Sequence, residues 1–373
     1  MKTRAALLRE APGSWEVAEV DLADPGPGEI QVQMVAAGLC HSDDHLTTGD
    51  MPVGLYPVVG GHEGAGVVTA VGPGVTEFAV GDHAGILCVA GCGKCRWCAM
   101  GAQNFCDLNA QLLSGGAPED PTRHRMSLDG KPIGQMVAVS TFSEYTTVSL
   151  ASAMKVPDDI PLDVAALVSC GVTTGWGAAV NSVQAKPGDT IMVVGIGGVG
   201  INGVQGARHA GASNIIAVDP NEWKTQRAKE FGATHSASSI EDGAELAKSL
   251  TGGQGADGVV ITIGVVRSEH VSQAFSAIRK GGTVAVVGLA SMIDEHPVAI
   301  SLAELTFYQK RLQGSLYGAA SPRYTVMRLL DLYRSGDLKL NELITSRYTL
   351  DEINNGYADM HAGKNIRGII QFA

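Results

Sequence analysis

The sequence predicts an α/β protein in which a doubly wound parallel sheet is inserted into an irregular, β-rich domain. The middle of the chain alternates short apolar runs with helical stretches, which is the pattern of a parallel sheet covered by helices. The regions on either side lack this alternation. The apolar runs lie at residues 191–194, 215–218, 258–263 and 283–287, and the helical stretches at 199–209, 222–231, 239–250 and 268–278.

The flanking regions have a different pattern of apolar and polar residues. Residues 1–35 alternate apolar and polar positions between Gly/Pro-rich turns, and residues 58–75 continue this pattern with interspersed glycines, as short β-strands do. After about residue 313 the pattern is mixed, with helical stretches at 322–335 and 350–361. This order predicts that the α/β region is inserted into the β-rich domain.

Composition excludes several classes of partner. The chain has 373 residues, enough for two or three domains, and a net charge of −11, which disfavours nucleic acid or an anionic membrane. No apolar run approaches the roughly 20 residues that span a bilayer. Arg9 and Glu10 interrupt the N-terminal stretch before a signal-peptide core can form. We therefore expect a cytoplasmic protein whose seven cysteines are metal ligands or reactive groups rather than disulfides.

A glycine pattern follows the first apolar run of the α/β region. Gly195, Gly197 and Gly200 form G-x-G-x-x-G. The first glycine permits a tight turn, the second lets a pyrophosphate approach the backbone, and the third lets the next helix pack closely. The helix start also favours a phosphate. Asp219 ends the next strand, near the offset of about 20 residues at which an acid binds ribose hydroxyls. A glycine turn without nucleotide is the alternative, and the position of Asp219 favours the dinucleotide site.

Four cysteines form a compact metal-binding pattern. They are Cys92, Cys95, Cys98 and Cys106, with the spacing C-x2-C-x2-C-x7-C. Four thiolates so close in the chain can surround one zinc ion tetrahedrally and leave no position for a substrate. An iron–sulfur cluster is the alternative, but the fourth-cysteine spacing and following proline of bacterial ferredoxins are absent. The pattern predicts a structural zinc site.

A second set of candidate ligands is dispersed. Cys40 opens the run Cys-His-Ser-Asp-Asp-His, His62 and Glu63 lie in a glycine-rich run, and Cys170 lies in an apolar one. Taken singly, Cys170 is more typical of a small buried side chain, and His62 of a loop histidine. Their spacing alone does not bring these residues together.

The chain resembles the zinc-dependent medium-chain alcohol dehydrogenases, whose motifs it matches in order from end to end. These motifs are Cys40–His45, Gly61–Glu63, the four-cysteine lobe, Cys170, Gly195–Gly200 and Asn365–Gly368. Within the family it resembles the actinobacterial nitrosodimethylaniline-dependent branch, which keeps NAD bound and passes its electrons to another acceptor, thought to be mycofactocin. That resemblance is carried by Leu39–Thr48, Cys95–Cys98 and Val265–Glu269, whereas residues 114–135 are atypical.

The resemblance implies a domain organisation. A GroES-like catalytic domain would span residues 1–171, with a structural zinc lobe at 88–113. An NAD-binding Rossmann domain would span 172–313, and 314–373 would return to the catalytic domain. Family members are homodimers or homotetramers, so we expect the same here.

The resemblance also implies the metal chemistry. Cys40, His62 and Cys170 would hold a catalytic zinc, with water or substrate in the fourth position, so that the chain would carry two zinc ions. An alcohol bound there loses its proton more easily than in water. Ser42 would take that proton and His45 would pass it outward through the cofactor ribose.

Further roles come from the same resemblance. Asp43 would hydrogen-bond a ligand histidine, and Glu63 would stand behind the metal. Cys88 and Met136 match positions that line the substrate pocket, although a packed, inert thiol is the alternative for Cys88. The cofactor-binding set would comprise His41, Thr174, Gly195, Gly197, Gly198, Val199, Gly200, Asp219, Lys224 and Arg367.

Within that set the roles differ. Asp219 would bind the adenosine ribose and repel an NADP phosphate, with Lys224 beside it. His41 and Arg367 would meet the pyrophosphate. Thr174 and Val199 would flank the nicotinamide, next to Gly198 at the helix start.

The expected activity is hydride transfer between a primary or secondary alcohol and NAD, and the resemblance to the nitrosodimethylaniline-dependent branch implies that NAD is retained and reoxidised in place. One alternative is a thiol-adduct formaldehyde dehydrogenase acting on a mycothiol or glutathione conjugate. A second alternative is a non-catalytic nucleotide-binding relative, which is disfavoured because Cys40, His62 and Cys170 are all present.

Overall fold

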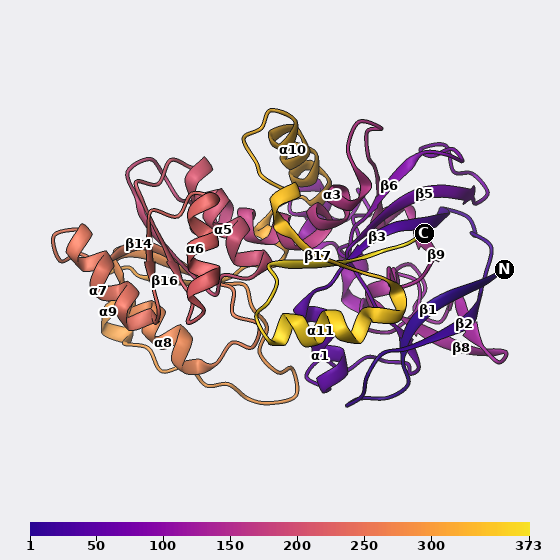
Figure 1. Cartoon of the computed structure of the whole chain (residues 1–373), viewed down its shortest axis with the longest axis horizontal. Coiled ribbons are helices and arrows are strands. Elements are labelled where there is room, and N and C mark those ends of the chain that lie inside the picture. The colour runs from indigo at the N-terminus through magenta and orange to yellow at the C-terminus, as the bar shows by residue number, and fades with distance from the viewer. The chain divides into compact units, whose positions relative to one another are not determined.

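The computed structural model describes residues 1–373 and divides into two compact units (Figure 1). The β-rich unit comprises Met1–Cys170, Ser321–Tyr333 and Leu340–Ala373. The α/β unit comprises Gly171–Ala320 and Arg334–Lys339. The predicted fold class, an irregular β-rich region with a doubly wound sheet, is confirmed.

The β-rich unit contains a closed barrel and a seven-stranded sheet. The barrel runs in the order β1 (Lys2–Leu8), β2 (Glu16–Leu22), β7 (Met126–Leu128), β8 (Lys131–Gln135) and β4 (Val58–Val59). The sheet runs in the order β10 (Ala153–Lys155), β6 (His83–Ile86), β5 (Gly64–Val71), β3 (Glu29–Gly38), β18 (Arg367–Gln371) and β17 (Ile344–Tyr348), and β9 (Tyr145–Ser149) pairs with β3. Strand β3 therefore lies at the centre of this unit, and Cys40 follows its end.

Close strand approach explains part of the glycine-rich run. β3 pairs with β5 antiparallel, with Met34 opposite Gly66. A Cβ atom at Gly66 would lie 2.0 Å from the carbonyl oxygen of Gln33, and only glycine avoids this clash.

The helices of this unit are α1 (His41–Thr48), α2 (Arg96–Ala99), α3 (Leu162–Leu167), α10 (Pro322–Arg334) and α11 (Ile353–His361).

The α/β unit contains one parallel sheet of six strands. Their order is β13 (His235–Ala237), β12 (Asn214–Val218), β11 (Thr190–Val194), β14 (Ala256–Ile261), β15 (Ile278–Val286) and β16 (Arg311–Gly314). All five pairings are parallel. In chain order this is 3-2-1-4-5-6, the doubly wound arrangement whose strand order reverses beside the first strand. Ligands of such sheets bind beyond the strand ends at that reversal, which here lies between β11 and β14.

Helix α4 (Thr173–Gly177) precedes the first strand of this unit, and the other helices follow strands. They are α5 (Gly198–His209), α6 (Glu222–Glu230), α7 (Ile240–Leu250), α8 (Ser268–Ala277) and α9 (Leu302–Phe307). All five residues of β11 are buried, as expected for a central strand covered on both faces. The sequence did not predict β16, because every residue of this edge strand is exposed and its apolar signal is weak.

Contrary to the expectation that no apolar run approaches the length of a membrane span, one helical stretch, Leu162–Ser182, is long and apolar enough to cross a membrane. Its most apolar window is 83% buried inside the protein, which is the property of a core helix. A π-helical turn, Val168–Val172, interrupts it. Such turns are often found at functional sites, and this one contains Cys170.

Candidate active site

The structure brings together two clusters of metal-ligating side chains. One consists of Cys92, Cys95, Cys98 and Cys106, and the other of Cys40, His62, Glu63 and Cys170. In each cluster the ligand atoms lie within 4.8 Å of one another. Neither contains a disulfide, because all seven cysteines are free. Both clusters belong to the β-rich unit.

The four-cysteine cluster includes two residues of the short helix α2 and its cap: Cys95 is the N-cap of α2, and Cys98 lies within it. Cys92 Sγ lies 3.8 Å from Cys98 Sγ, and Cys95 Sγ lies 3.9 Å from Cys106 Sγ. Backbone N–H groups donate to these sulfurs, from Cys95 to Cys92 at 3.3 Å and from Cys98 to Cys95 at 3.5 Å. Backbone donors lower the pKa of Cys95 to about 6. The donor set and the spacing of the sulfurs fit a tetrahedral zinc ion.

The second cluster is assembled from three separate segments. Cys40 is the residue before α1, His62 and Glu63 immediately precede β5, and Cys170 lies in the π-helical turn. Cys40 and His62 are buried, with 7% and 3% of their surface exposed. Two thiols and an imidazole fit a zinc ion that keeps an open coordination position.

Asp43 orients His62. One carboxylate oxygen of Asp43 accepts a hydrogen bond from Gly61 N at 2.8 Å, and the other lies 3.1 Å from His62 Nδ1. His62 Nε2 is buried beside the Cys40 sulfur without a conventional hydrogen-bond partner. A histidine that binds a metal usually donates one ring N–H to a carboxylate and uses the other ring nitrogen as the ligand.

Glu63 forms a buried ion pair with Arg367, at the start of β18. Burial raises the pKa of Glu63 to about 7, against the opposing effect of the Arg367 charge. A Cβ atom at Gly38 would lie 2.1 Å from Glu63 Oε2 and 2.6 Å from Arg367 Nη2, so the pair requires glycine at this position. The guanidinium expected at the pyrophosphate is thus already engaged with Glu63 on one side.

The other polar candidates lie on α1. Ser42 Oγ lies 3.7 Å from Cys40 Sγ. His45 is buried, and its Nδ1 is 3.4 Å from Asp50 Oδ2. His41 is exposed, with its ring centroid 6.5 Å from that of His361.

Two further candidates are buried close to these groups. The neighbouring Cys40 and Cys88 thiols raise the pKa of Cys170, so Cys88 adjoins the second cluster. Met136 is 1% exposed and belongs to the same apolar cluster as Leu46 and Met51.

The glycine loop of the α/β unit shows three distinct environments. Gly195 has φ +90°, a left-handed conformation that favours glycine. A Cβ at Gly200 would lie 1.9 Å from the Gly195 carbonyl oxygen, whereas a Cβ at Gly197 would meet nothing within 4 Å. Gly197 precedes α5 without a side-chain cap, so free N–H groups border open space. This cradle fits the pyrophosphate of a dinucleotide.

Asp219 and Thr262 tie this loop in place. Asp219 Oδ2 accepts a hydrogen bond from Ile196 N at 2.8 Å, and its Oδ1 accepts one from Asn221 N at 2.9 Å. Thr262 Oγ1 donates to the Gly195 carbonyl oxygen at 2.6 Å. Thr262 was not predicted from the sequence, although its position just after β14, at the reversal of strand order, is a usable signal.

The remaining cofactor candidates lie on the surrounding helices. Thr174 and Val199 belong to α4 and α5, which approach so closely that a Cβ at Gly175 would lie 2.0 Å from Val199 O. Gly198 is the first residue of α5, and Lys224 is on α6 after Asp219.

Comparison with known proteins agrees with this geometry. Residues 26–158 match the alcohol dehydrogenase GroES-like domain, and residues 198–333 match the zinc-binding dehydrogenase family. The chain is 48% identical over 371 residues to the NDMA-dependent alcohol dehydrogenase of Amycolatopsis methanolica, covering 99% of each chain. It is 44% identical over 372 residues to alcohol dehydrogenase B of Mycobacterium tuberculosis, covering 100% of this chain and 99% of that one.

A solved structure has the same fold. Benzyl alcohol dehydrogenase from Acinetobacter calcoaceticus is 31% identical, with a TM-score of 0.91 and complete coverage of both chains. The two matched domains, the full-length relatives and the paired zinc-ligand clusters lead to one conclusion: the chain belongs to the zinc-dependent medium-chain alcohol dehydrogenase family.

Proposed function

We propose that this enzyme transfers a hydride between a primary or secondary alcohol and NAD, and that NAD(H) stays bound and is reoxidised in place by a second acceptor. The observation that carries the proposal is the meeting of Cys40, His62 and Cys170 in one buried cluster, since these segments are far apart in the chain. The α/β unit contributes the phosphate cradle at Gly197. Zinc in both clusters and NAD(H) in the cradle are therefore the proposed cofactors.

The residues have separate tasks in this proposal. Cys40, His62 and Cys170 hold the catalytic zinc, which when bound supplies Lewis acidity toward an alcohol oxygen, and NAD supplies the hydride acceptor. Ser42 takes the hydroxyl proton and His45, three residues further along α1, passes it outward. Asp43 keeps the His62 ring in its ligating orientation.

Glu63 and the cofactor residues complete the assignment. Glu63 stands beside the ligands and is held there by Arg367. His41 and Arg367 are the proposed pyrophosphate contacts, and Asp219 and Lys224 the proposed ribose contacts. Thr174, Gly198 and Val199 are assigned to the nicotinamide side. The structural zinc is assigned to Cys92, Cys95, Cys98 and Cys106.

Retention of NAD rests on similarity to the NDMA-dependent enzyme of Amycolatopsis methanolica. It requires that cofactor dissociation be slower than turnover. Mycofactocin is the proposed physiological acceptor. The proposed location is the cytoplasm, in line with the free cysteines.

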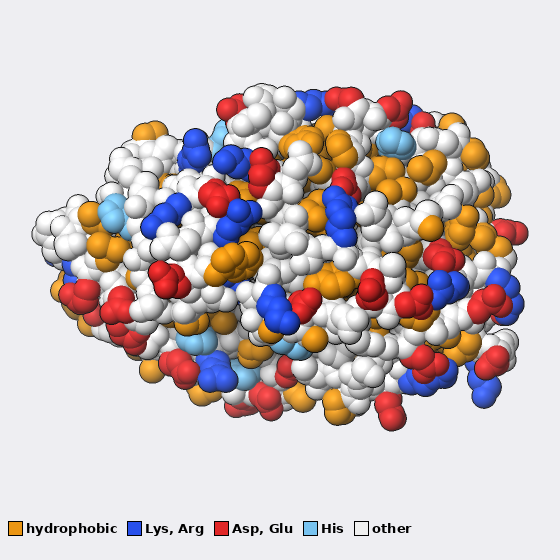
Figure 2. Space-filling model, viewed as in Figure 1, with side chains coloured by type: hydrophobic (Ala, Val, Ile, Leu, Met, Phe, Trp, Pro, Cys, Tyr) orange, Lys and Arg blue, Asp and Glu red, His pale blue; other side chains and the backbone are white.

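We also propose a homodimer or homotetramer joined through the α/β unit. All four residues of the edge strand β16 are exposed, and Leu302 and Phe307 of the preceding helix are 72% and 81% exposed. An unpaired edge beside large exposed apolar side chains is typical of a surface covered by a second copy. On the face shown in Figure 2, acidic, basic and hydrophobic side chains are interspersed.

Retention is tested on freshly purified protein. Denaturation should release NAD(H), identified by mass and absorbance, and alcohol oxidation should run for many turnovers with nitrosodimethylaniline and no added NAD. With free NAD alone, turnover should be slow because the reduced cofactor cannot leave. Rapid steady-state release of NADH without another acceptor contradicts retention but not alcohol oxidation. Absence of turnover with alcohols under both conditions, together with turnover of a mycothiol adduct, supports the formaldehyde dehydrogenase alternative.

A further inference from the structure

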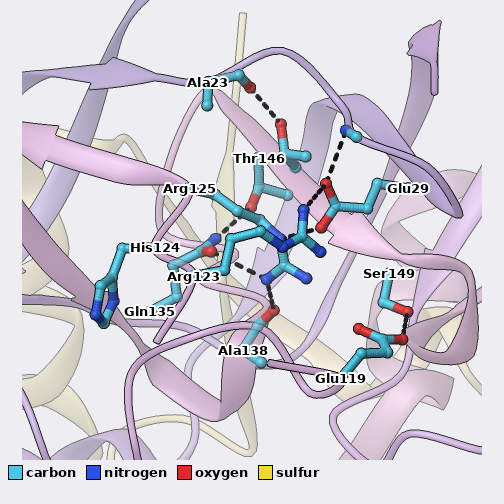
Figure 3. A network of polar contacts seen from close by, with 12 residues as sticks. Ala23, Glu29, Glu119, Arg123, His124, Arg125, Gln135, Ala138, Thr146 and Ser149 are labelled. Carbon is cyan, nitrogen blue, oxygen red and sulfur yellow. Dashed lines mark hydrogen bonds and ion pairs between the residues drawn. The ribbon is translucent and has the colours of Figure 1, made fainter. Parts of the chain in front are cut away.

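A buried carboxylate in the β-rich unit is bridged by two arginines (Figure 3). Glu29, at the start of β3, is 1% exposed. Arg123 Nη1 lies 2.7 Å from one of its oxygens, and Arg125 Nε lies 2.5 Å from the other. Burial alone would raise the pKa of Glu29, but Arg125, Arg123 and the N–H of Gly26 hold it below its usual value. The Glu29–Arg125 ion pair is therefore charged and shielded from solvent on both sides.

The two arginines differ in what else they touch. Arg123 is partly exposed, and among the residues drawn in Figure 3 its side chain forms an ion pair only with Glu29. Arg125 is 3% exposed, and its Nη1 also donates to the carbonyl oxygen of Ala138 at 3.1 Å and to Gln135 Oε1 at 3.2 Å. Arg125 thus connects the ion pair to the turn that follows β8.

That turn, Met136–Ser140, has an unfavourable backbone. Val137, Ala138 and Ser140 have φ of 42°, 62° and 51°, in the left-handed region that residues with a Cβ rarely adopt and that is most costly for a β-branched valine. Side chains hold its carbonyl groups from outside: Arg125 donates to Ala138 O, while Thr146 Oγ1 donates to Val139 O. A turn of this kind persists only where its surroundings over-determine it.

The same turn contacts the segment that carries the metal-ligating residues. Ser140 Oγ donates to Val59 O at 2.6 Å, Thr141 N donates to Gly61 O at 2.9 Å, and Thr141 Oγ1 donates to Glu63 O at 2.8 Å. The backbone on both sides of His62 is therefore fixed by residues 140–141. A shift of the turn would therefore move the backbone that carries His62.

We propose that Arg125 is a positioning residue: by bridging Glu29 and Ala138 O it holds the Met136–Ser140 turn, and through that turn the His62–Glu63 segment, in the conformation that brings the metal ligands together. This assignment rests on the proposed function only in that the ligands hold a catalytic zinc. The hydrogen bonds of the Arg125 side chain go to Glu29, Gln135 and Ala138, none of which is a metal-ligating residue.

The test compares Arg125→Lys with Arg123→Lys. Both variants keep a cation beside Glu29, but lysine lacks the fork that reaches Glu29 and Ala138 O together. In Arg125→Lys we expect amide exchange in the peptide 134–142 to be about tenfold faster, the usual effect of losing one hydrogen bond to a charged group. Arg123→Lys should exchange like the wild type. Hydrogen-exchange mass spectrometry of the intact protein measures these exchange rates and does not depend on catalytic activity.

Zinc release gives an internal control. With a chelator in excess, Arg125→Lys should lose one of its two zinc ions faster than the wild type and the other at an unchanged rate, because the hydrogen bonds of the four cysteines lie within their own loop. Loss of kcat with little change in KM should accompany it. Equal acceleration of both zinc ions, or equal behaviour of the two lysine variants, overturns the proposal.

A milder variant covers the case in which Arg125→Lys does not fold. Thr146→Val removes the hydroxyl that donates to Val139 O, leaves that oxygen the longer hydrogen bond from Gln135 Nε2 at 3.4 Å, and buries no charge, so it should fold and raise exchange in the same peptide to a smaller extent. Unchanged exchange in that variant contradicts the premise that side-chain donors to its carbonyl groups hold this turn, which the role of Arg125 requires. A wild-type chain that turns over no alcohol contradicts the proposed function, whereas the exchange measurement still decides the role of Arg125.

Discussion

Asp43 Oδ2 lies 3.1 Å from His62 Nδ1, and both side chains are withdrawn from solvent, with 0% and 3% exposed. Replacing Asp43 by asparagine leaves an acceptor for Gly61 N but removes the charge that orients the ring. We expect Asp43→Asn to weaken binding of the catalytic zinc by about 10- to 100-fold, the usual cost of losing such a partner. Competition with a chromogenic chelator measures this.

The neighbouring acid is the matched control for that variant. Asp44 pairs with the half-exposed His361 at 2.9 Å, on the other side of the same helix start. Asp44→Asn should leave zinc affinity unchanged, because exposed ion pairs contribute little. Equal zinc loss in both variants would show that α1 stability, rather than His62 orientation, is what Asp43 provides.

Replacing a cysteine should have different effects on activity and folding in the two clusters. Cys170→Ser should abolish turnover and leave melting almost unchanged, because the zinc proposed for that cluster keeps an open position for the substrate and the cluster is assigned to catalysis. Cys95→Ser should lower the yield of soluble protein, since a structural zinc contributes directly to folding. Zinc content, thermal melting and activity distinguish the variants, and equal loss of folding in both contradicts the division of tasks.

Substitution by alanine should affect stability at one glycine of the phosphate loop and cofactor binding at another. Gly200→Ala places a Cβ 1.9 Å from Gly195 O, so the α5–β11 contact must open and stability should fall by about 1–3 kcal/mol or more. Gly197→Ala meets nothing within 4 Å and should fold normally, but it fills the cradle and should lower the amount of NAD that copurifies. Melting temperature and cofactor content are the two measurements. Normal NAD content in a folded Gly197→Ala protein contradicts the cradle.

Asp219 should decide between NAD and NADP. A carboxylate beside the ribose repels a 2′-phosphate, so Asp219→Ser should narrow the difference in affinity between the two cofactors. The same change also loosens the ties to Ile196 and Asn221, and absolute affinity should fall for NAD.

Thr262→Val separates these two effects. It removes the hydrogen bond to Gly195 O but no charge, so it should weaken both cofactors equally. Titration of cofactor-stripped protein gives the affinities. A wild-type protein that binds NAD and NADP equally contradicts the role of Asp219.

Local patterns in the sequence predicted the parts of the structure that are themselves local. The buried strand β11 and its glycine loop are contiguous, and the four-cysteine cluster is contained in a single loop, so spacing alone was sufficient. The strand β16 was not predicted because its four residues are exposed and carry no alternation.

The second cluster depends on tertiary structure. No periodicity relates Cys40, His62 and Cys170, and only family resemblance indicated that they would meet. The pairing of Glu29 with Arg125 was also not predicted. Arg123-His124-Arg125 follows a polar stretch and has the pattern of a solvated surface, and nothing local shows that one arginine is buried.

The contrast between the two clusters has a consequence for biosynthesis. The four structural ligands occupy residues 92–106 and can meet as soon as that loop has emerged from the ribosome, at a small cost in chain entropy. The catalytic set cannot close until Cys170 has been synthesised and β5, α1 and the π-helical turn have come together. The order of the residues along the chain therefore allows the four-cysteine cluster to form, and to bind a metal, before the second cluster can exist.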